Sequence, residues 1–188
     1  MPTRLAVIGA VAVLFALTGC SADEEKKAAI VEPVPSASIV VEPAAAAGGA
    51  CILWDWDLIE QTIGFRFDVA AADQLDDTSS CVVQKLGEPW PDLSLSVVET
   101  TKANAEVFMA ERMPAKAVKL KGLGRAGYRT YVQPAGEHGI STEIGWLSEA
   151  KQVQTLRLTF PKGTPAAQVK TSDAGLLNLA KALSTTNG

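Results

Sequence analysis

The sequence has few of the residues from which catalytic and metal sites are built. Its 188 residues include one histidine, His138, and three cysteines. Zinc sites draw on several histidine and cysteine ligands. If the cysteines have other roles, the single histidine leaves too few ligands for such a site. Ser141 follows His138 closely but lacks the glycine-flanked elbow of serine hydrolases. We therefore expect no metal, no cofactor and no enzyme activity, and a hydrolase built on these two residues is only a third hypothesis.

The chain also lacks an excess of positive charge. Lysine and arginine number 17 against 21 aspartate and glutamate residues, which gives a formal net charge of -4. Nucleic-acid binding depends on clustered basic side chains that neutralise phosphates, so we exclude nucleic acid as the main partner. Asp73, Asp76 and Asp77 leave calcium open as an alternative, although they do not form the regular calcium-binding loop.

No apolar run in the sequence is long enough to span a bilayer. The longest, Leu5–Leu17, follows the basic Arg4 and falls short of the roughly 20 residues that a spanning helix needs. This layout is typical of a secretory signal peptide. The next residues complete the sequence Leu-Thr-Gly-Cys, which resembles the bacterial lipobox and implies acylation of Cys20. An ordinary secretory cleavage site is the alternative.

The first 50 residues are therefore expected to be a leader and a tether. We predict that residues 1–19 are removed and that acylated Cys20 holds the protein on the outer face of the cytoplasmic membrane. Residues 20–50 are rich in proline and alanine and contain no aromatic residue. Such a segment cannot bury enough apolar surface to offset the entropy of ordering it, so we predict a disordered tether.

Residues 51–188 are predicted to form a single domain, because their number suits one hydrophobic core. This domain contains two cysteines, Cys51 and Cys81. An even pair in an oxidising compartment predicts a disulfide. A redox-active or metal-binding pair is less consistent with the sequence, because the Cys-x-x-Cys spacing is absent.

Apolar periodicity alternates between helical and strand types along this domain. Helices are predicted over 54–63, 101–113 and 172–183, and strands over 65–69, 81–86, 93–98, 128–132, 140–147 and 153–160. The acidic stretch 73–80 is predicted to be a loop. Short connections between the strands favour hairpins. The expected fold class is therefore α+β, with an antiparallel sheet of about five strands flanked by two or three helices.

Several features together resemble a family of uncharacterised actinobacterial envelope lipoproteins. They are the lipobox, the tether, the two cysteines, the Gly-Leu-Gly at Gly122–Gly124 and the Leu-x-x-Ala-Lys-Ala-Leu segment at Leu177–Leu183. The resemblance implies a PsbP-like fold, a curved antiparallel sheet flanked by helices, over most of Cys51–Leu183. It carries over no catalytic residues.

Basic residues gather in the middle of the domain with no acid among them. We consider as possible partner-binding residues Lys116, Lys119, Lys121, Arg125 and Arg129, together with Trp90, which lies between two prolines. A solvated surface is the alternative interpretation. The predicted function is that of a non-enzymatic envelope lipoprotein whose domain binds an envelope protein or a lipidic or cell-wall ligand. A lipid or small-molecule carrier with an apolar cavity is the alternative function.

Overall fold

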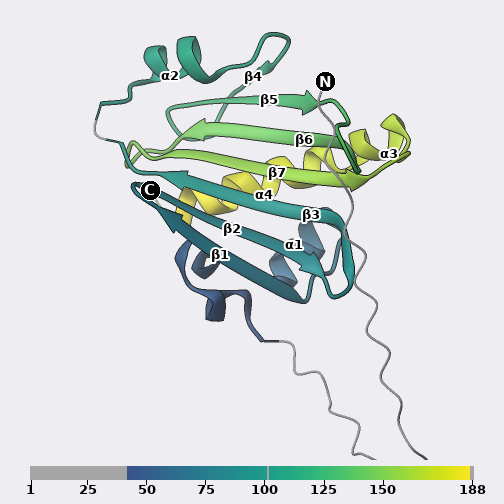
Figure 1. Cartoon of the computed structure of the whole chain (residues 1–188). Helices are drawn as coiled ribbons and strands as arrows, with labels where there is room; N and C mark the ends of the chain where they lie inside the picture. The colour runs from purple at the N-terminus through teal and green to yellow at the C-terminus, as the bar shows by residue number, and fades with distance from the viewer. Residues whose placement is uncertain (1–41, 101, 187–188) are drawn as a thin grey trace, which may run out of the picture. The chain divides into compact units, whose positions relative to one another are not determined.

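The computed structural model describes residues 42–100 and 102–186. They contain one antiparallel sheet of seven strands in the order β1-β2-β3-β7-β6-β5-β4 (Figure 1). The strands are β1 (Val69–Leu75), β2 (Thr78–Lys85), β3 (Glu88–Val98), β4 (Val118–Leu120), β5 (Ala126–Val132), β6 (His138–Leu147) and β7 (Val153–Pro161). The helices are the 3-10 helices η1 (Ala44–Ala47) and η2 (Gly49–Leu53) and the α-helices α1 (Trp56–Ile63), α2 (Ala105–Arg112), α3 (Ala166–Thr171) and α4 (Asp173–Thr186). The α+β class is confirmed, whereas the expected number of about five strands is wrong.

The first hairpin differs from its prediction. Strands β1 and β2 pair from Val69 with Gln84 to Leu75 with Thr78. Only Asp76 and Asp77 are left for the turn, so most of the predicted acidic loop is strand. Asp76 takes a φ of 51°, which aspartate tolerates better than most residues and which hairpin turns require. The acidic residues correctly marked a turn, but they did not show how tight it is.

The edge strand β4 and the start of β3 were also not predicted from the sequence. Pro89 and Pro91 precede the predicted strand 93–98, and proline cannot donate a hydrogen bond to a strand ladder. In the structure the pairing of β3 with β7 runs from Asp92 to Val98. The prolines therefore precede the part of β3 that is paired on both sides. Strand β4 at the sheet edge has three residues, too few for any periodicity to reveal.

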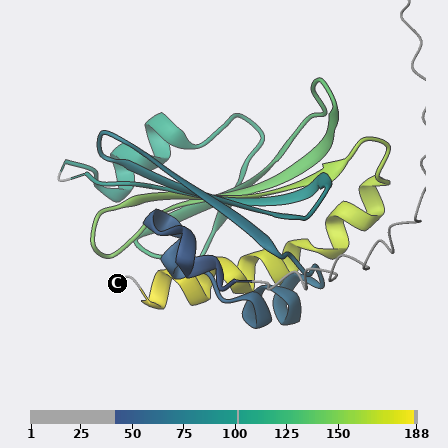
Figure 2. The ribbon, with the colours of Figure 1, turned by 60° about the horizontal axis from the view of Figure 1, so that its bottom comes forward.

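The helices divide unequally between the two faces of the sheet. Helices α1, α3 and α4 and both 3-10 helices lie on one side, and α2 lies on the other (Figure 2). We call the side with α4 the covered face and the opposite side the open face. Successive strand residues point to opposite faces. Leu93, Leu95, Leu156 and Leu158 point to the covered face and are fully buried, so the core lies between this face and its helices.

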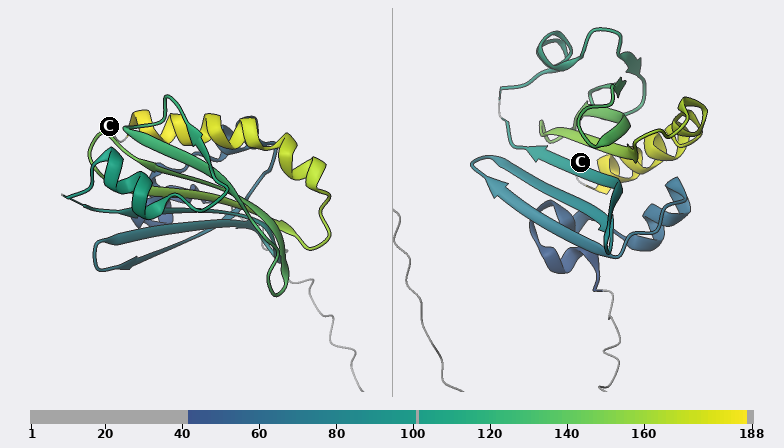
Figure 3. Two further views of the ribbon diagram at one scale, coloured as in Figure 1. Left: turned by 90° about the horizontal axis from the view of Figure 1, so that it is seen from above. Right: turned by 45° about the vertical axis from the view of Figure 1, so that its right-hand side comes forward.

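Helix α4 covers the central strands. Helices α3 and α4 follow one another along the sheet (Figure 3). The helix predicted over 172–183 is confirmed, and it buries an apolar stripe, since Leu176 and Leu179 are fully buried in the core. Helix α1 packs closely against α4 at Gly175, where an added Cβ would lie 2.1 Å from the carbonyl oxygen of Thr62. This contact leaves no room for a larger residue than glycine.

The N-terminal segment is fastened to the sheet by the predicted disulfide. Cys51 in η2 is bonded to Cys81 in β2, and both residues are fully buried. The packed chain begins earlier than Cys51, because Ala44 and Ala50 belong to the same core. The predicted tether, 20–50, therefore extends too far. Alanines in this segment fit beneath the sheet, which their linker-like composition did not indicate.

Removing the disulfide should lower the stability of the domain without changing its fold. The bond closes a loop between residues 30 apart in sequence. Such a loop is worth on the order of 3 kcal/mol through the entropy of the unfolded chain. The double variant Cys51→Ala/Cys81→Ala should unfold at a lower urea concentration, and its free energy of unfolding should be lower by about this amount. Reductant should destabilise the parent protein and leave the double variant unchanged; equal unfolding midpoints for the two proteins would contradict the prediction.

Candidate functional site: the open sheet face

The open face has a floor of small hydroxyl side chains. The cross-strand register places Ser80, Ser96 and Thr155 in one row across β2, β3 and β7, and Val82, Ser94 and Arg157 in the next. Within residues 42–100 and 102–186, the hydroxyl groups of Ser94, Ser96 and Thr155 have no hydrogen-bond partner. All three residues are partly exposed. Their hydroxyls are therefore available to a ligand.

A buried carboxylate neutralises the arginine in the middle of this face. Glu143 is 7% exposed. Its Oε1 accepts a hydrogen bond from the Tyr128 hydroxyl at 3.1 Å, and its Oε2 accepts one from Nε of Arg157 at 3.0 Å. Nη2 of Arg157 also donates to this oxygen. The pair is thus one unit with no net charge, although the Arg157 side chain is 44% exposed.

Burial and the neighbouring carboxylate both raise the pKa of Tyr128. Burial is the main cause, and the negative charge of Glu143 and its hydrogen bond add to it, so that the pKa of Tyr128 rises to about 12. The ring of Tyr128 also occupies the space above Gly145, where an added Cβ would lie 2.5 Å from it. Tyr128 therefore forms a wall at the β5–β6 side of the open face.

Helix α2 closes one end of the open face. Phe108 stacks on Tyr128 with 5.9 Å between ring centroids. Beside this contact is a surface pocket of about 390 Å³, to which Val98 and Val153 contribute from the sheet and Val107 contributes from α2. Val98 pairs with Val153, and this pair follows the pair of Ser96 with Thr155 on the same face. The pocket therefore continues the floor of the open face toward α2.

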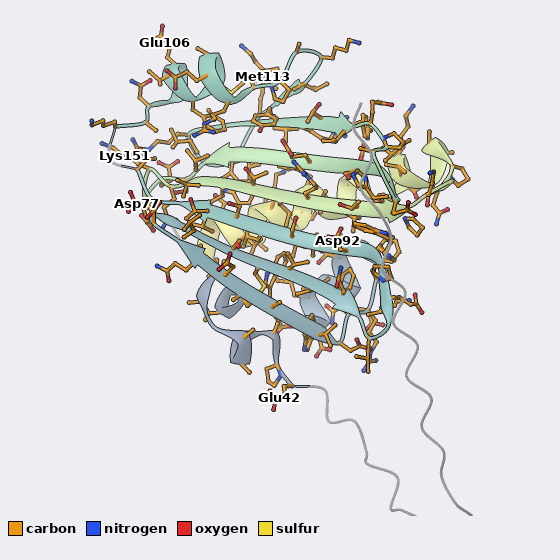
Figure 4. All side chains as sticks on the ribbon, viewed as in Figure 1. Glu42, Asp77, Asp92, Glu106, Met113 and Lys151 are labelled. Atoms are coloured by element: carbon orange, nitrogen blue, oxygen red, sulfur yellow. A yellow bond between two sulfur atoms is a disulfide. The ribbon has the colours of Figure 1, made fainter. Side chains whose placement is uncertain are left out.

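A second polar group lies at the other end of the face. Asp92 lies far along β3 from Lys151, which marks the end nearest α2 (Figure 4). Asp92 is opposite Thr159 in the ladder, and Oγ of Ser141 donates to Oγ1 of Thr159 at 3.2 Å. Oδ1 of Asp92 is buried and has no hydrogen-bond partner among the described residues. This oxygen is an unused acceptor.

Two aromatic rings border this carboxylate. The rings of Trp90 and His138 lie with their centroids 5.6 Å apart. Burial raises the pKa of Asp92 above its ordinary value, while the hydrogen bond from Thr159 and the charges of Arg157 and His138 partly offset the rise. The end of the open face thus combines a partly exposed indole with a carboxyl group whose negative charge is disfavoured.

The geometry gives no support to the hydrolase hypothesis. The hydroxyl of Ser141 is 1% exposed and donates to Thr159. Nδ1 of His138 lies 2.8 Å from the carbonyl oxygen of Gly139. A nucleophile must be reachable by substrate and within hydrogen-bond distance of its base, and the contacts of Ser141 and His138 show neither condition met.

The predicted partner-binding residues fall into exposed lysines, arginines with acidic partners, and Trp90. Lys116, Lys119 and Lys121 are exposed on or beside β4, where lysines discourage edge-to-edge strand pairing. The two arginines have acidic partners: Arg125 lies 3.4 Å from Glu149, and Arg129 lies 2.8 Å from Asp173.

Trp90 is remote from these lysines. It lies beside His138 at the start of β6, whereas Lys119 pairs with Tyr128, which pairs with Gly145 near the end of β6. Of the predicted set, Trp90 lies at one end of the open face, and Lys119 lies on the same side of the sheet at its β4 edge.

The hydroxyl floor was not identified from the sequence as a site, although its signal is present. Ser94 and Ser96 alternate with Leu93 and Leu95, and Thr155 and Thr159 alternate with leucines in the same way. This pattern identifies the solvent-facing half of each strand. It does not show that β3 and β7 are neighbours, and their pairing alone creates a continuous hydroxyl surface.

The predictions on lipidation, membrane attachment and metal binding concern different parts of the chain. Cys20 and the signal peptide lie outside the described residues. Within residues 42–100 and 102–186, no helix is long and apolar enough to cross a membrane. The same residues contain no grouping of three or more histidine, cysteine or acidic side chains that could hold a metal ion, and Asp76 and Asp77 form a hairpin turn.

Comparison with known proteins yields no relative. No family model matches the chain, and no curated protein and no solved structure shows significant similarity to it. The resemblance to actinobacterial envelope lipoproteins therefore stays a prediction.

The alkaline titration of the protein should report on Tyr128. The chain contains two tyrosines, and burial raises the pKa of Tyr131 as well, with the hydrogen bond from its hydroxyl to Asp173 as a further cause. The folded protein should therefore have less than half of its tyrosine ionised at pH 10, where free tyrosine is half ionised. Because the unfolded chain releases these protons at lower pH, stability should fall as pH rises from about 10 toward 12.

Ultraviolet difference spectroscopy would measure this titration. The control is the same protein in denaturant, where both tyrosines should ionise near pH 10. Half-ionisation near pH 10 in the folded state would contradict the buried hydrogen bond between Tyr128 and Glu143.

Proposed function

We propose that this chain is a non-enzymatic lipoprotein of the cell envelope that binds a partner through the open face of its sheet. In this proposal acylated Cys20 holds the domain on the outer face of the cytoplasmic membrane. The observation that supports a binding role is the uneven covering of the sheet. One face is packed under helices, while the other presents Ser94, Ser96 and Thr155, whose hydroxyls have no partner in the described part of the chain.

The composition of the open face argues for binding over simple solvation. On the open side of β3 and β7 between Asp92 and Thr159, the ionisable side chains are Asp92 and Arg157, and Glu143 neutralises the latter. A face this low in net charge costs less to desolvate than an ordinary surface, because burying unpaired charges is what makes desolvation costly.

A small-molecule carrier is the second candidate. A pocket of about 280 Å³ lies between β5, β6 and α3, and its lining is mainly apolar, with Tyr131, Ile140 and Val169 among its residues. This volume is just under the usual range of about 300–1,000 Å³ for ligand pockets. The pocket would suit a small apolar group better than a lipid chain.

A photoreactive amino acid at position 96 should report contact with the partner. Placed in the full chain in its own cells, it should give crosslinked products of higher mass when irradiated. The matched control position is Lys181, which is exposed on α4 and belongs to the covered side. Products that are equally abundant at both positions, or absent at position 96, would refute binding by the open face.

The membrane address makes a separate prediction. Cys20→Ala should leave the precursor uncleaved or release the protein from the membrane fraction, because no thiol remains to carry the acyl chains that anchor it. Fractionation of cells and intact-mass measurement would show this. If the variant still yielded processed, acylated, membrane-bound protein, Cys20 would not be the lipidation site.

A further inference from the structure

We propose that the open face binds an uncharged polysaccharide, with one sugar ring against Trp90 and the following rings along Ser94, Ser96 and Thr155. This inference rests on the proposed function, because it assumes that the open face is the binding surface. It adds the chemical class of the partner.

The charge of the face selects an uncharged partner. Arg157 is neutralised by Glu143 at 3.0 Å. Burial raises the pKa of Asp92 and so opposes its negative charge. Phosphate-rich polymers and anionic lipid head groups are bound by unpaired basic residues. Basic residues lie around the hydroxyl floor: Lys119 is on the edge strand β4, and Lys102 and Arg112 line the pocket near α2 together with Glu99 and Glu111. The floor of Ser94, Ser96 and Thr155 between them offers no unpaired positive charge to an anionic ligand.

The side chains of the face match the hydrogen-bonding groups of a sugar. Each hydroxyl of Ser94, Ser96 and Thr155 can donate one hydrogen bond and accept others, as can each hydroxyl of a polysaccharide. Protein interfaces make a poorer match, because their buried centres are enriched in aromatic residues, methionine and arginine and depleted in serine. The floor between Asp92 and Val98 contains no aromatic residue.

The Trp90 end supplies the remaining elements of a sugar site. The partly exposed indole of Trp90 has a flat apolar surface and a polar N–H group, which suits a sugar ring with its C–H groups on one side and hydroxyls at its edge. Oδ1 of Asp92 has no donor within the described part of the chain. In the proposed complex a hydroxyl of the bound ring donates a hydrogen bond to this oxygen after a small adjustment of the Asp92 side chain.

The length of the face favours a chain over a single sugar. From Asp92 to Val98 the strand rises about 20 Å at about 3.3 Å per residue. The Trp90–His138 pair lies at one end, and the pocket of about 390 Å³ beside α2 lies at the other. Several consecutive rings can therefore contact the floor at once, each through weak hydrogen bonds.

Affinity electrophoresis of the mature chain in gels containing polysaccharide would test this proposal. The probes are dextran, arabinan and galactan, which are uncharged, with polygalacturonate as the charged comparison. We expect at least one uncharged polymer to retard the protein, and Trp90→Ala or Ser94→Ala/Ser96→Ala to weaken binding by about tenfold, a loss of about 1.4 kcal/mol. Trp56→Ala, at a partly exposed tryptophan on the covered side, should retain full retardation.

A second variant, which keeps Trp90, separates loss of binding from loss of folding. Ser96→Lys adds a long charged side chain to a partly exposed position and should abolish retardation while the unfolding temperature stays near that of the parent. Retardation by none of the uncharged polymers, or by polygalacturonate alone, would overturn the sugar assignment. If crosslinking from position 96 still succeeded, the open face would remain the binding surface and only the ligand class would be wrong; failure of both would remove the proposed function.

Discussion

The alternation of apolar and polar residues in β3, β7 and β6 is the constraint on which the rest of the structure depends. Leu95, Leu156 and Ile144 lie side by side on the covered face and are fully buried. A slip of one residue in either pairing would move a whole set of apolar side chains to solvent. Burial therefore fixes the register, and the fixed register sets Ser96 beside Thr155 and Arg157 beside Glu143. The geometry of the open face is thus a consequence of how the core packs.

Two further ties hold the helical layer on one side of the sheet. The disulfide fastens η2 to β2. At the start of α4, Asp173 forms an ion pair with Arg129 of β5 at 2.8 Å and accepts a hydrogen bond from Thr142 of β6 at 3.3 Å. A partly buried charge of this kind needs such partners. Because the ties lie on the covered face, they leave the hydroxyl floor free of helices other than α2.

The candidate site could be predicted only in part, for reasons that differ between its residues. Ser94 and Thr155 could be assigned to the polar side of their strands, because period-two alternation is local. Trp90 could be suspected of exposure from its two flanking prolines. The contact between Trp90 and His138 could not be foreseen, since 48 positions separate the two residues in the printed numbering. Arg129 was expected in a basic binding surface, but it lies on the opposite face from Arg157 and is paired with Asp173.

The sequence by itself determined the α+β class, the apolar stripe of α4, the buried half of the central strands and the pairing of Cys51 with Cys81. These features depend on local periodicity or on the small number of cysteines, and both can be read from neighbouring residues. Only the tertiary structure decided the strand order, the inclusion of Ala44 and Ala50 in the core and the assembly of the open face. Those features depend on contacts between segments far apart in the chain, whose relative stability is a sum over the whole core that no single segment encodes.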